Sequence, residues 1–211
     1  MALAISDAAA ETGHMTHLIE AVHPFSSGLV AAASTELGCD AAEVWRRGRR
    51  GQVTIDRRAT DAAVDDWPLP PMGERLGVTV VDLGLADGDP AEGYTCTVVV
   101  CRPTVPGTRL TEHLLDSLTQ QPLAIAAIGP AKWPGEVTAG LGPRLRALRS
   151  AGRVIPMPMD RRLAITGLTA SPLPKAVRAS GHSLLQLAAG PTAPGAPAAL
   201  AGPLSTRGSA S

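Results

Sequence analysis

Val78-Thr79-Val80-Val81-Asp82 is an uninterrupted, mostly β-branched run that ends on a carboxylate. β-Branched residues favour strands. A run without polar alternation is typical of a strand buried on both faces, as in parallel sheets that helices cover. The stretch therefore predicts an α/β fold with a mainly parallel sheet, helices on both faces, and this strand in the interior.

The rest of the chain alternates between strand-like and helix-like segments. Strands show as Val- and Ile-rich runs, and helices as apolar residues at four-residue spacing. Strands are predicted at 17–22, 52–55, 95–101, 123–128 and 153–155, and helices at 29–37, 40–47, 108–119, 143–150 and 173–189. The alternation after residue 77 is typical of βαβ units, which have parallel strands.

The two ends of the chain differ in composition from its middle. Residues 1–15 are rich in Ala and polar residues, and we expect a flexible N-terminal lead there. Residues 190–211 contain mainly Gly, Ala, Pro and Ser without periodicity, which predicts a disordered tail. One α/β domain is expected between them, over residues 16–189.

Composition excludes several classes of function. The formal net charge is +0, so there is no overall attraction to nucleic acid or to a membrane surface. Aromatic residues make up 2% of the chain, too few for base-stacking platforms. No segment approaches the roughly 18 apolar residues of a membrane span, and the N-terminus lacks the pattern of a signal peptide. We expect a cytoplasmic protein without a membrane span.

Five segments resemble, in their order along the chain, the ParA/MinD family of P-loop NTPases, the deviant Walker A class that acts in partitioning and positioning. They are residues 18–24, 78–82, 98–104, 124–129 and 154–160. The second of them is similar to the Walker B strand of that family. The resemblance implies a P-loop NTPase-like fold.

The resemblance also implies where a nucleotide and its magnesium ion would bind. Asp82 takes the Walker B position, where it would hold Mg²⁺ through water. Glu20 and His23 stand where the family carries aspartates in its second strand, which implies catalytic roles. The implied nucleotide-binding positions are Gly129, Pro156, Met157 and Asp160. From the residues alone, Asp82 could instead cap the turn that follows its strand, and Glu20 and His23 could simply end theirs.

The sequence departs from the family where phosphate is bound. That chemistry needs backbone N–H groups at a helix N-terminus, a lysine on the β- and γ-phosphates and a hydroxyl on magnesium. The only lysines are Lys132 and Lys175, and neither lies in a Gly-rich loop. ATP and Mg²⁺ are therefore expected as cofactors only if another segment supplies such a loop.

Two functions remain open for this domain. The first is a degenerate or N-terminally truncated ParA/MinD-like domain that serves as a regulatory or partner-binding module and forms homodimers or binds another protein. The second is an active ATPase whose phosphate loop comes from upstream sequence or from a partner chain.

A cluster of arginines suggests a third function. Six lie close together in the sequence: Arg46, Arg47, Arg49, Arg50, Arg57 and Arg58. They could contact a DNA backbone, where each phosphate contact would add to salt-dependent binding. They could equally face the acidic residues Asp61, Asp65 and Asp66, bind an acidic partner, or form a solvated charged face.

Overall fold

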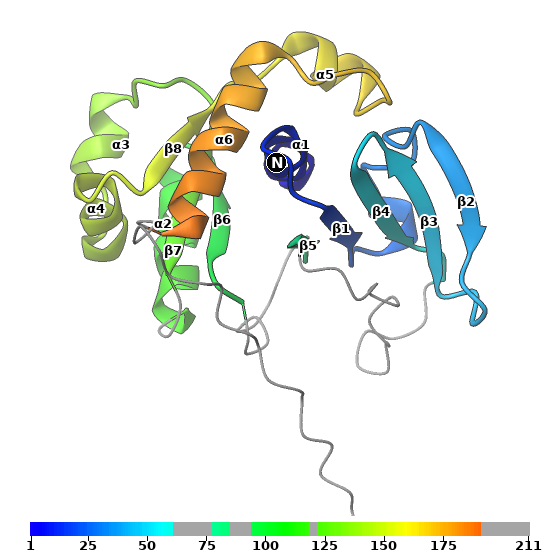
Figure 1. Cartoon of the computed structure of the whole chain (residues 1–211). Coiled ribbons are helices and arrows are strands. Elements are labelled where there is room, and N and C mark those ends of the chain that lie inside the picture. Colours follow the sequence, from blue (N-terminus) through cyan, green and yellow to red (C-terminus); the bar gives the residue numbers. More distant parts are fainter. Residues whose placement is uncertain (61–76, 85–93, 119–121, 191–211) are drawn as a thin grey trace, which may run out of the picture.

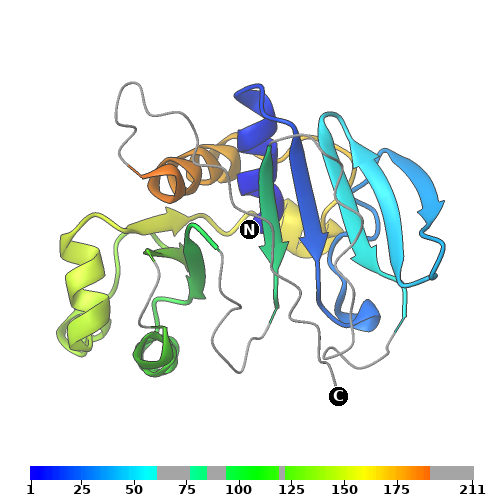
Figure 2. The ribbon, with the colours of Figure 1, turned by 60° about the horizontal axis from the view of Figure 1, so that its bottom comes forward.

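The computed structural model describes residues 1–60, 77–84, 94–118 and 122–190. In these ranges the chain forms two β-sheets that share one layer of helices (Figure 1). One sheet has five strands in the order β2-β3-β4-β1-β5, and the other has three in the order β6-β7-β8. Figure 2 shows β5 at the edge of the first sheet and β6 in the second.

The five-stranded sheet is mixed. Its strands are β1 (Thr16–Glu20), β2 (Thr35–Cys39), β3 (Trp45–Arg50), β4 (Val53–Arg58) and β5 (Val78–Asp82). β2, β3 and β4 form an antiparallel meander, whereas β1 lies between β4 and β5 and is parallel to both. β1 therefore has a strand on each side, and β5 is paired through one edge, to β1.

The three-stranded sheet is parallel throughout. Its strands are β6 (Thr97–Cys101), β7 (Leu123–Ile128) and β8 (Val154–Met157). The connections run through α2 (Val105–Ser117), then through α3 (Gly135–Ala139) and α4 (Pro143–Ser150). A crossover helix is the usual way to join parallel strands.

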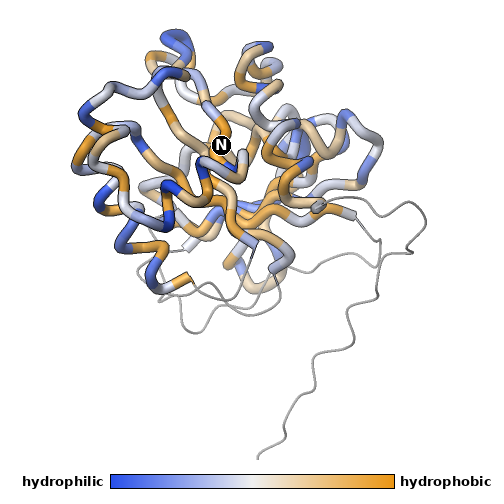
Figure 3. The backbone as a smooth tube through the Cα atoms, turned by 90° about the vertical axis from the view of Figure 1, so that its left-hand side faces the viewer, coloured by the Kyte–Doolittle hydropathy of each residue, from blue (hydrophilic) through white to orange (hydrophobic). Residues whose placement is uncertain are grey.

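Helices α1 (Ala2–Glu11) and α6 (Lys175–Ala189) pack side by side and cover both sheets. α1 lies against β1 and β5, and α6 lies against β7 and β8 (Figure 1). The two helices come very close at Gly181, where a Cβ would lie 2.2 Å from the carbonyl oxygen of Ala4. One apolar cluster beneath them joins the sheets, with Leu3, Leu18, Ala126 and Leu184 among its buried members. Figure 3 shows the backbone coloured by hydropathy, with hydrophobic stretches passing through the interior of the fold.

A second apolar cluster covers the opposite face of the three-stranded sheet. It joins β6 and β7 to α2, α3 and α4, with Leu115, Ile125 and Leu145 fully buried. The three-stranded sheet is therefore enclosed between two layers of helices. Two short elements remain, the 3-10 turn η1 (Pro24–Ser26) and helix α5 (Arg161–Thr166).

The expectation of a flexible lead over residues 1–15 is wrong, because residues 2–11 form α1. Seven of its ten residues are buried, and Leu3 and Ala9 are at most 1% exposed. Alanine and leucine are strong helix formers, and tertiary packing of an apolar face stabilises a helix this short. The unit that shares the main core therefore begins at α1 rather than at residue 16.

Two predicted helices are also wrong. The segment predicted as a helix over 29–37 contains turns and the start of β2, and the one over 40–47 contains the start of β3. Asp40 begins the second of these segments, where it would be the N-cap of a helix. Its Oδ1 instead accepts hydrogen bonds from the backbone N–H groups of Val44 and Trp45, which holds the β2–β3 turn. Asp side chains favour such local turns as much as helix starts, which explains the error.

Other expectations are confirmed. The α/β class holds, and the strands at 78–82 and 123–128 and the helix at 143–150 have the predicted bounds. The mainly parallel sheet is corrected to one mixed and one parallel sheet. The interior position of β5 is corrected as well, because none of its residues is fully buried. The predicted tail lies outside the described residues after Gly190.

Candidate functional site

Two of the three sequence-predicted catalytic positions, Glu20 and Asp82, meet at the carboxyl edge of the five-stranded sheet. Arg57 on β4, Glu20 on β1 and Asp82 on β5 are register partners across three neighbouring parallel strands. Glu20 and Asp82 end their strands, and Arg57 is the second-last residue of β4. Along this edge the basic side chain of Arg57 is therefore followed by the acidic side chains of Glu20 and Asp82.

Glu20 is 3% exposed and is held by the loop that follows η1. Its carboxylate accepts hydrogen bonds from the Ser27 hydroxyl and, at 2.9 Å, from the backbone N–H of Gly28. Burial raises the pKa of Glu20 above its ordinary value and the negative charge of Asp82 adds to the rise, although the two hydrogen bonds and Arg57 act in the opposite direction. A buried carboxyl with a raised pKa is suited to hold a proton.

Asp82 lies beside Glu20 and caps the turn after its own strand. Its Oδ1 accepts a hydrogen bond from the backbone N–H of Gly84 at 3.0 Å, which matches the capping role left open by the sequence. Among the described residues, no group of three or more His, Cys, Asp or Glu side chains could hold a metal ion. The Mg²⁺ role of Asp82 therefore stays a prediction that depends on ligands other than these side chains.

The amino group of the first residue is influenced by the charge of Asp82. Met1 forms the N-cap of α1, without a side-chain capping bond. Burial lowers the pKa of its amino group below the ordinary value, whereas the nearby charge of Asp82 acts to raise it. A positive amino group also meets the positive end of the helix dipole here. The charge of Asp82 on β5 therefore acts on the amino group at the start of α1.

His23 does not join this group. It is the N-cap of η1, where its Nδ1 accepts a hydrogen bond from the backbone N–H of Phe25 at 3.3 Å. Its ring packs on the Phe25 ring with centroids 5.2 Å apart. The structure therefore places Glu20 with Ser27 and Gly28 rather than in a pair with His23.

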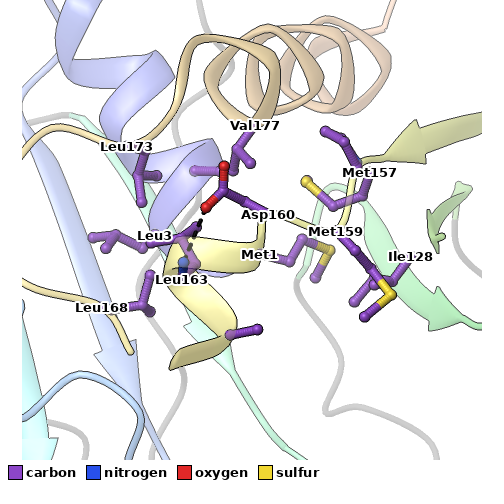
Figure 4. A pocket seen from close by; sticks show the side chains of 13 residues that line it. Met1, Leu3, Ile128, Met157, Met159, Asp160, Leu163, Leu168, Leu173 and Val177 are labelled. Carbon is purple, nitrogen blue, oxygen red and sulfur yellow. Dashed lines mark hydrogen bonds between the residues drawn. The ribbon is translucent and has the colours of Figure 1, made fainter. Parts of the chain in front are cut away.

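A pocket of about 260 Å³ opens beside the start of α1 (Figure 4). Side chains from α1, the end of β7, the segment before α5, and α6 converge on it. Met1, Met157 and Leu173 are among the lining residues, together with Asp160. The lining is mainly apolar, so it offers few polar partners for a phosphate group.

The predicted nucleotide-binding residues divide between this pocket and its surroundings. Met157 and Asp160 line the pocket. Asp160 already caps α5, since its Oδ1 accepts a hydrogen bond from the N–H of Leu163 at 2.9 Å. Pro156 is exposed, and its carbonyl accepts a bond from the Ser180 hydroxyl. Gly129 donates its N–H to the carbonyl of Met157, linking the ends of β7 and β8.

The arginine cluster does not form one exposed surface. Arg47 donates to both carboxylate oxygens of Asp56, at 2.8 and 2.7 Å, and the same carboxylate contacts His17 at 2.6 Å. Asp56 is fully buried. Burial alone would raise its pKa, but the bonds from Arg47 and His17 outweigh this and hold the pKa below its ordinary value.

Three further arginines are buried. Arg50 pairs with Asp7 of α1 and donates to the carbonyls of Ala32, Thr169 and Ser171. Arg57 pairs with Glu36 at 2.6 Å, and the third buried residue is Arg58. Of the six, Arg46 and Arg49 are exposed. The hydrogen-bonding capacity of this cluster is therefore used mostly inside the protein.

Sequence reasoning missed the residues that hold this edge together. Ser27 and Gly28 fix Glu20, and Asp56 joins β1, β3 and β4. None of these three residues was predicted as a site residue. Asp56 did carry a signal, because it is the lone acid among six arginines. The influence of Asp82 on the amino group of Met1 had no signal, since the first residues were not expected to form a helix.

No model of a protein family matches the sequence, and a search of curated proteins finds no matching relative. Within the described ranges, no helix is both long enough and apolar enough to cross a membrane.

Proposed function

We propose that this chain is a ParA/MinD-like domain of P-loop NTPase type that lacks the phosphate-binding loop and acts as a cytoplasmic regulatory or partner-binding module. The observation that carries this proposal is the edge where Glu20 and Asp82 meet. That geometry supports the Walker B comparison for Asp82. The adjoining apolar pocket supports a site of nucleotide-binding type.

The charges at this edge argue against triphosphate binding by the 211 residues alone. Two carboxylates lie side by side, and the neighbouring cation, Arg57, is already paired with Glu36. Both lysines are exposed, and neither has the Gly-rich neighbourhood that phosphate binding needs. A polyanion placed here would meet uncompensated negative charge, so binding of a protein partner is favoured over hydrolysis.

Isothermal titration with ATP and Mg²⁺ tests the proposal. We expect no binding at micromolar nucleotide, either by the unaltered chain or by Asp82→Asn. Micromolar binding by the unaltered chain that is lost in Asp82→Asn would contradict the proposal and establish a working nucleotide site.

A second candidate is an active ATPase completed by a phosphate loop from upstream sequence or a partner chain. It is favoured by Asp82, which ends β5 at the carboxyl edge of the sheet, the position that the Walker B comparison implies. An in-frame Gly-rich, Lys-containing loop in the genomic DNA just upstream of Met1 would support it. Loss of phosphate release on Asp82→Asn in the extended protein would test the role of the carboxylate.

DNA binding through the arginine cluster is a weaker candidate, because Arg50, Arg57 and Arg58 are buried. It now depends on Arg46 and Arg49. A gel shift that persists unchanged after both are replaced by alanine would rule out this surface.

A further inference from the structure

A second pocket lies at the start of β8, whereas the pocket in Figure 4 lies at the end of that strand. It has a volume of about 420 Å³. Helix α6 packs across β7 and β8 (Figure 1), and the last turns of this helix form one wall of the pocket. None of the sequence-predicted site residues lines it. The lining residues are Arg153, Ile155, Ser183, Gln186, Leu187 and Gly190.

Arg153 is held in place by both its backbone and its side chain. Its backbone N–H donates to the carbonyl of Leu148 at 2.9 Å, and its own carbonyl accepts from the N–H of Ile125 at 2.8 Å. The Nε of its guanidinium donates to the carbonyl of Leu123. A cation that is already positioned loses less side-chain freedom when it binds a ligand, so less of the interaction energy is spent on ordering it.

The positive charge of Arg153 has no carboxylate partner among the described residues. The four elements around it, β6, β7, β8 and α6, contain no Asp or Glu. The negative end of the α6 dipole, which ends at Gly190, offsets only about half of a unit charge. The Nη2 of Arg153 is buried and, in the part of the chain that the structure describes, has no hydrogen-bond partner. An unpaired N–H shielded from water costs free energy, so this position favours an anionic acceptor.

The neighbouring thiol of Cys96 does not neutralise this cation. Burial raises the pKa of Cys96 above its ordinary value, although the charge of Arg153 and a hydrogen bond from its side chain act in the opposite direction. A thiol whose pKa is raised stays protonated near neutral pH. The charge of the guanidinium is therefore left for another group to balance.

The other walls of the pocket combine apolar and polar side chains. Ile155 and Leu187 are half-buried. The hydroxyl of Ser183 donates to the carbonyl of Ala179 at 3.2 Å, which leaves its oxygen as an acceptor, and the amide of Gln186 can both donate and accept. Apolar walls with a few oriented polar groups are typical of sites for small organic ligands.

The charge of the pocket selects among anions. Arg153 is the single cation among the described residues that line it, so it balances one negative charge. A carboxylate carries that charge, and its two oxygens fit the planar donor arrangement of a guanidinium. A phosphate dianion would leave a second negative charge without a partner. The apolar walls call for a ligand that also has a hydrocarbon part.

We propose that this pocket binds a small organic monocarboxylate, with the carboxylate on the guanidinium of Arg153 and the apolar body against Ile155 and Leu187. The site lies apart from the sheet edge where Glu20 and Asp82 meet, and binding there needs neither nucleotide nor Mg²⁺. The inference goes beyond the proposed function, and it stands or fails separately from it.

The test titrates the full chain with hexanoate and with hexanol, which has the same carbon chain without the charge. Amide NMR shifts are followed at Ser183, Gln186 and Leu187. We expect hexanoate to bind there with a Kd below about 1 mM, and at least about tenfold more tightly than hexanol. Equal binding of the two probes, or no shift with hexanoate up to about 10 mM, would overturn the proposal. Shifts confined to Leu173 and Val177 would also overturn it, because these residues line the pocket in Figure 4.

Two matched variants each remove one positive charge. Arg153→Met keeps a long, unbranched side chain but loses the guanidinium, and we expect it to bind hexanoate at least about tenfold more weakly. Arg162→Met removes an exposed cation from α5, outside the pocket, and should bind hexanoate as the unaltered chain does. Unchanged binding by Arg153→Met, or equal weakening by both variants, would overturn the proposal.

A third variant leaves Arg153 and its bond to Leu123 unchanged. Ser183→Phe places a ring in the pocket from the side of α6, and its melting temperature shows whether the chain still folds. We expect it to abolish the hexanoate shifts at Gln186 and Leu187. A folded Ser183→Phe chain that binds hexanoate as tightly as the unaltered chain would overturn the placement of the ligand in this pocket.

Hexyl phosphate tests the assignment to a carboxylate. Near pH 7.5 it carries more than one negative charge on the same hydrocarbon chain. We expect it to bind no more tightly than hexanoate, because one guanidinium balances one charge. Tighter binding of hexyl phosphate that is lost in Arg153→Met would overturn the carboxylate assignment.

Discussion

Within the described ranges, β1 and β7 differ from β5 and β6 in the number of neighbouring strands, although all four are short strands of five or six residues. β1 and β7 are paired along both edges, and four of the six residues of β7 are at most 1% exposed. In the part of the chain that the structure describes, β5 and β6 are each paired along one edge, and β5 has no fully buried residue. The Val-rich sequence of β5 suits an interior strand better than the position it holds.

This difference shows what an apolar strand sequence does and does not determine. β-Branched composition sets the tendency to form a strand and to lie under helices. The number of neighbouring strands depends on the segments available to pair, which composition does not specify. The interior-type sequence of β5 at the edge of its sheet illustrates this limit of composition.

The largest expected effect contrasts the two kinds of strand directly. Ile125 in β7 is fully buried, whereas Val100 in β6 is 47% exposed. Ile125→Ala should destabilise the protein by about 3 kcal/mol through lost burial and a cavity, and Val100→Ala by less than about 1 kcal/mol. Urea unfolding measures both. Equal losses would mean that the edge of β6 is as well covered as the centre of its sheet.

The next effect concerns the ion-pair network that fixes β1 in its sheet. Asp56→Ala removes the partner of His17 on β1 and Arg47 on β3 and should cost about 2 kcal/mol at neutral pH. The side chain of Arg47 is 36% exposed, which limits the loss. Asp56→Asn, which keeps the shape, is the matched variant, and urea unfolding compares the two.

The network also has a defined pH dependence. The pKa of Asp56 is lowered in the folded protein, so its stabilising contribution is complete above the ordinary carboxyl pKa and is lost as the pH falls toward the folded-state value. The wild-type protein should therefore lose more stability than Asp56→Asn when acidified below about pH 4. Parallel losses would show that the ionised carboxylate contributes nothing.

A smaller effect tests the α1–α6 contact that spans the two sheets. Gly181→Ala places a methyl group 2.2 Å from the backbone oxygen of Ala4 if nothing moves. We expect destabilisation of about 1 to 3 kcal/mol in thermal or urea unfolding. Gly135→Ala is the control, because a Cβ there meets nothing within 4 Å. Equal results would show that the helices are not in close contact.

The smallest effect concerns Glu20, at the carboxyl end of β1 next to β5. Its pKa is raised in the folded protein, so its ionised form is disfavoured and stability falls as the pH rises through the folded-state pKa. Glu20→Gln should be slightly more stable than wild type at pH 7, and the difference should vanish near pH 4. A less stable variant at pH 7 would contradict this sign.

The sequence was sufficient to predict the helices and strands whose pattern lies within the element itself. Residues 78–82 and 123–128 are dense in apolar residues between turns, and both strands have the predicted bounds. α1 was missed because its stability comes from packing on β5 and α6, which no local pattern shows. The β3 segment was assigned to a helix because Asp40 favours both turns and helix starts.

The position of the candidate site in the sheet was predictable from the sequence, but its side-chain contacts were not. Glu20 and Asp82 were each expected at the end of a strand, and they are register partners across β1 and β5. The pairing of the arginines was not predictable, because Asp7, Glu36 and Asp56 come from three separate elements. Charge partners far apart in sequence are set by the fold and not by spacing.

The most direct test of the difference between paired and open strands is amide hydrogen exchange on the unaltered chain. The backbone N–H groups of Val81, Val98 and Val100 face away from the strand that pairs with β5 or β6. We expect these amides to exchange at least about tenfold faster than those of Ile19 and Ile125, whose strands are paired on both sides. Equal protection at all five amides would contradict the account, because it would show that β5 and β6 already have partners along their outer edges.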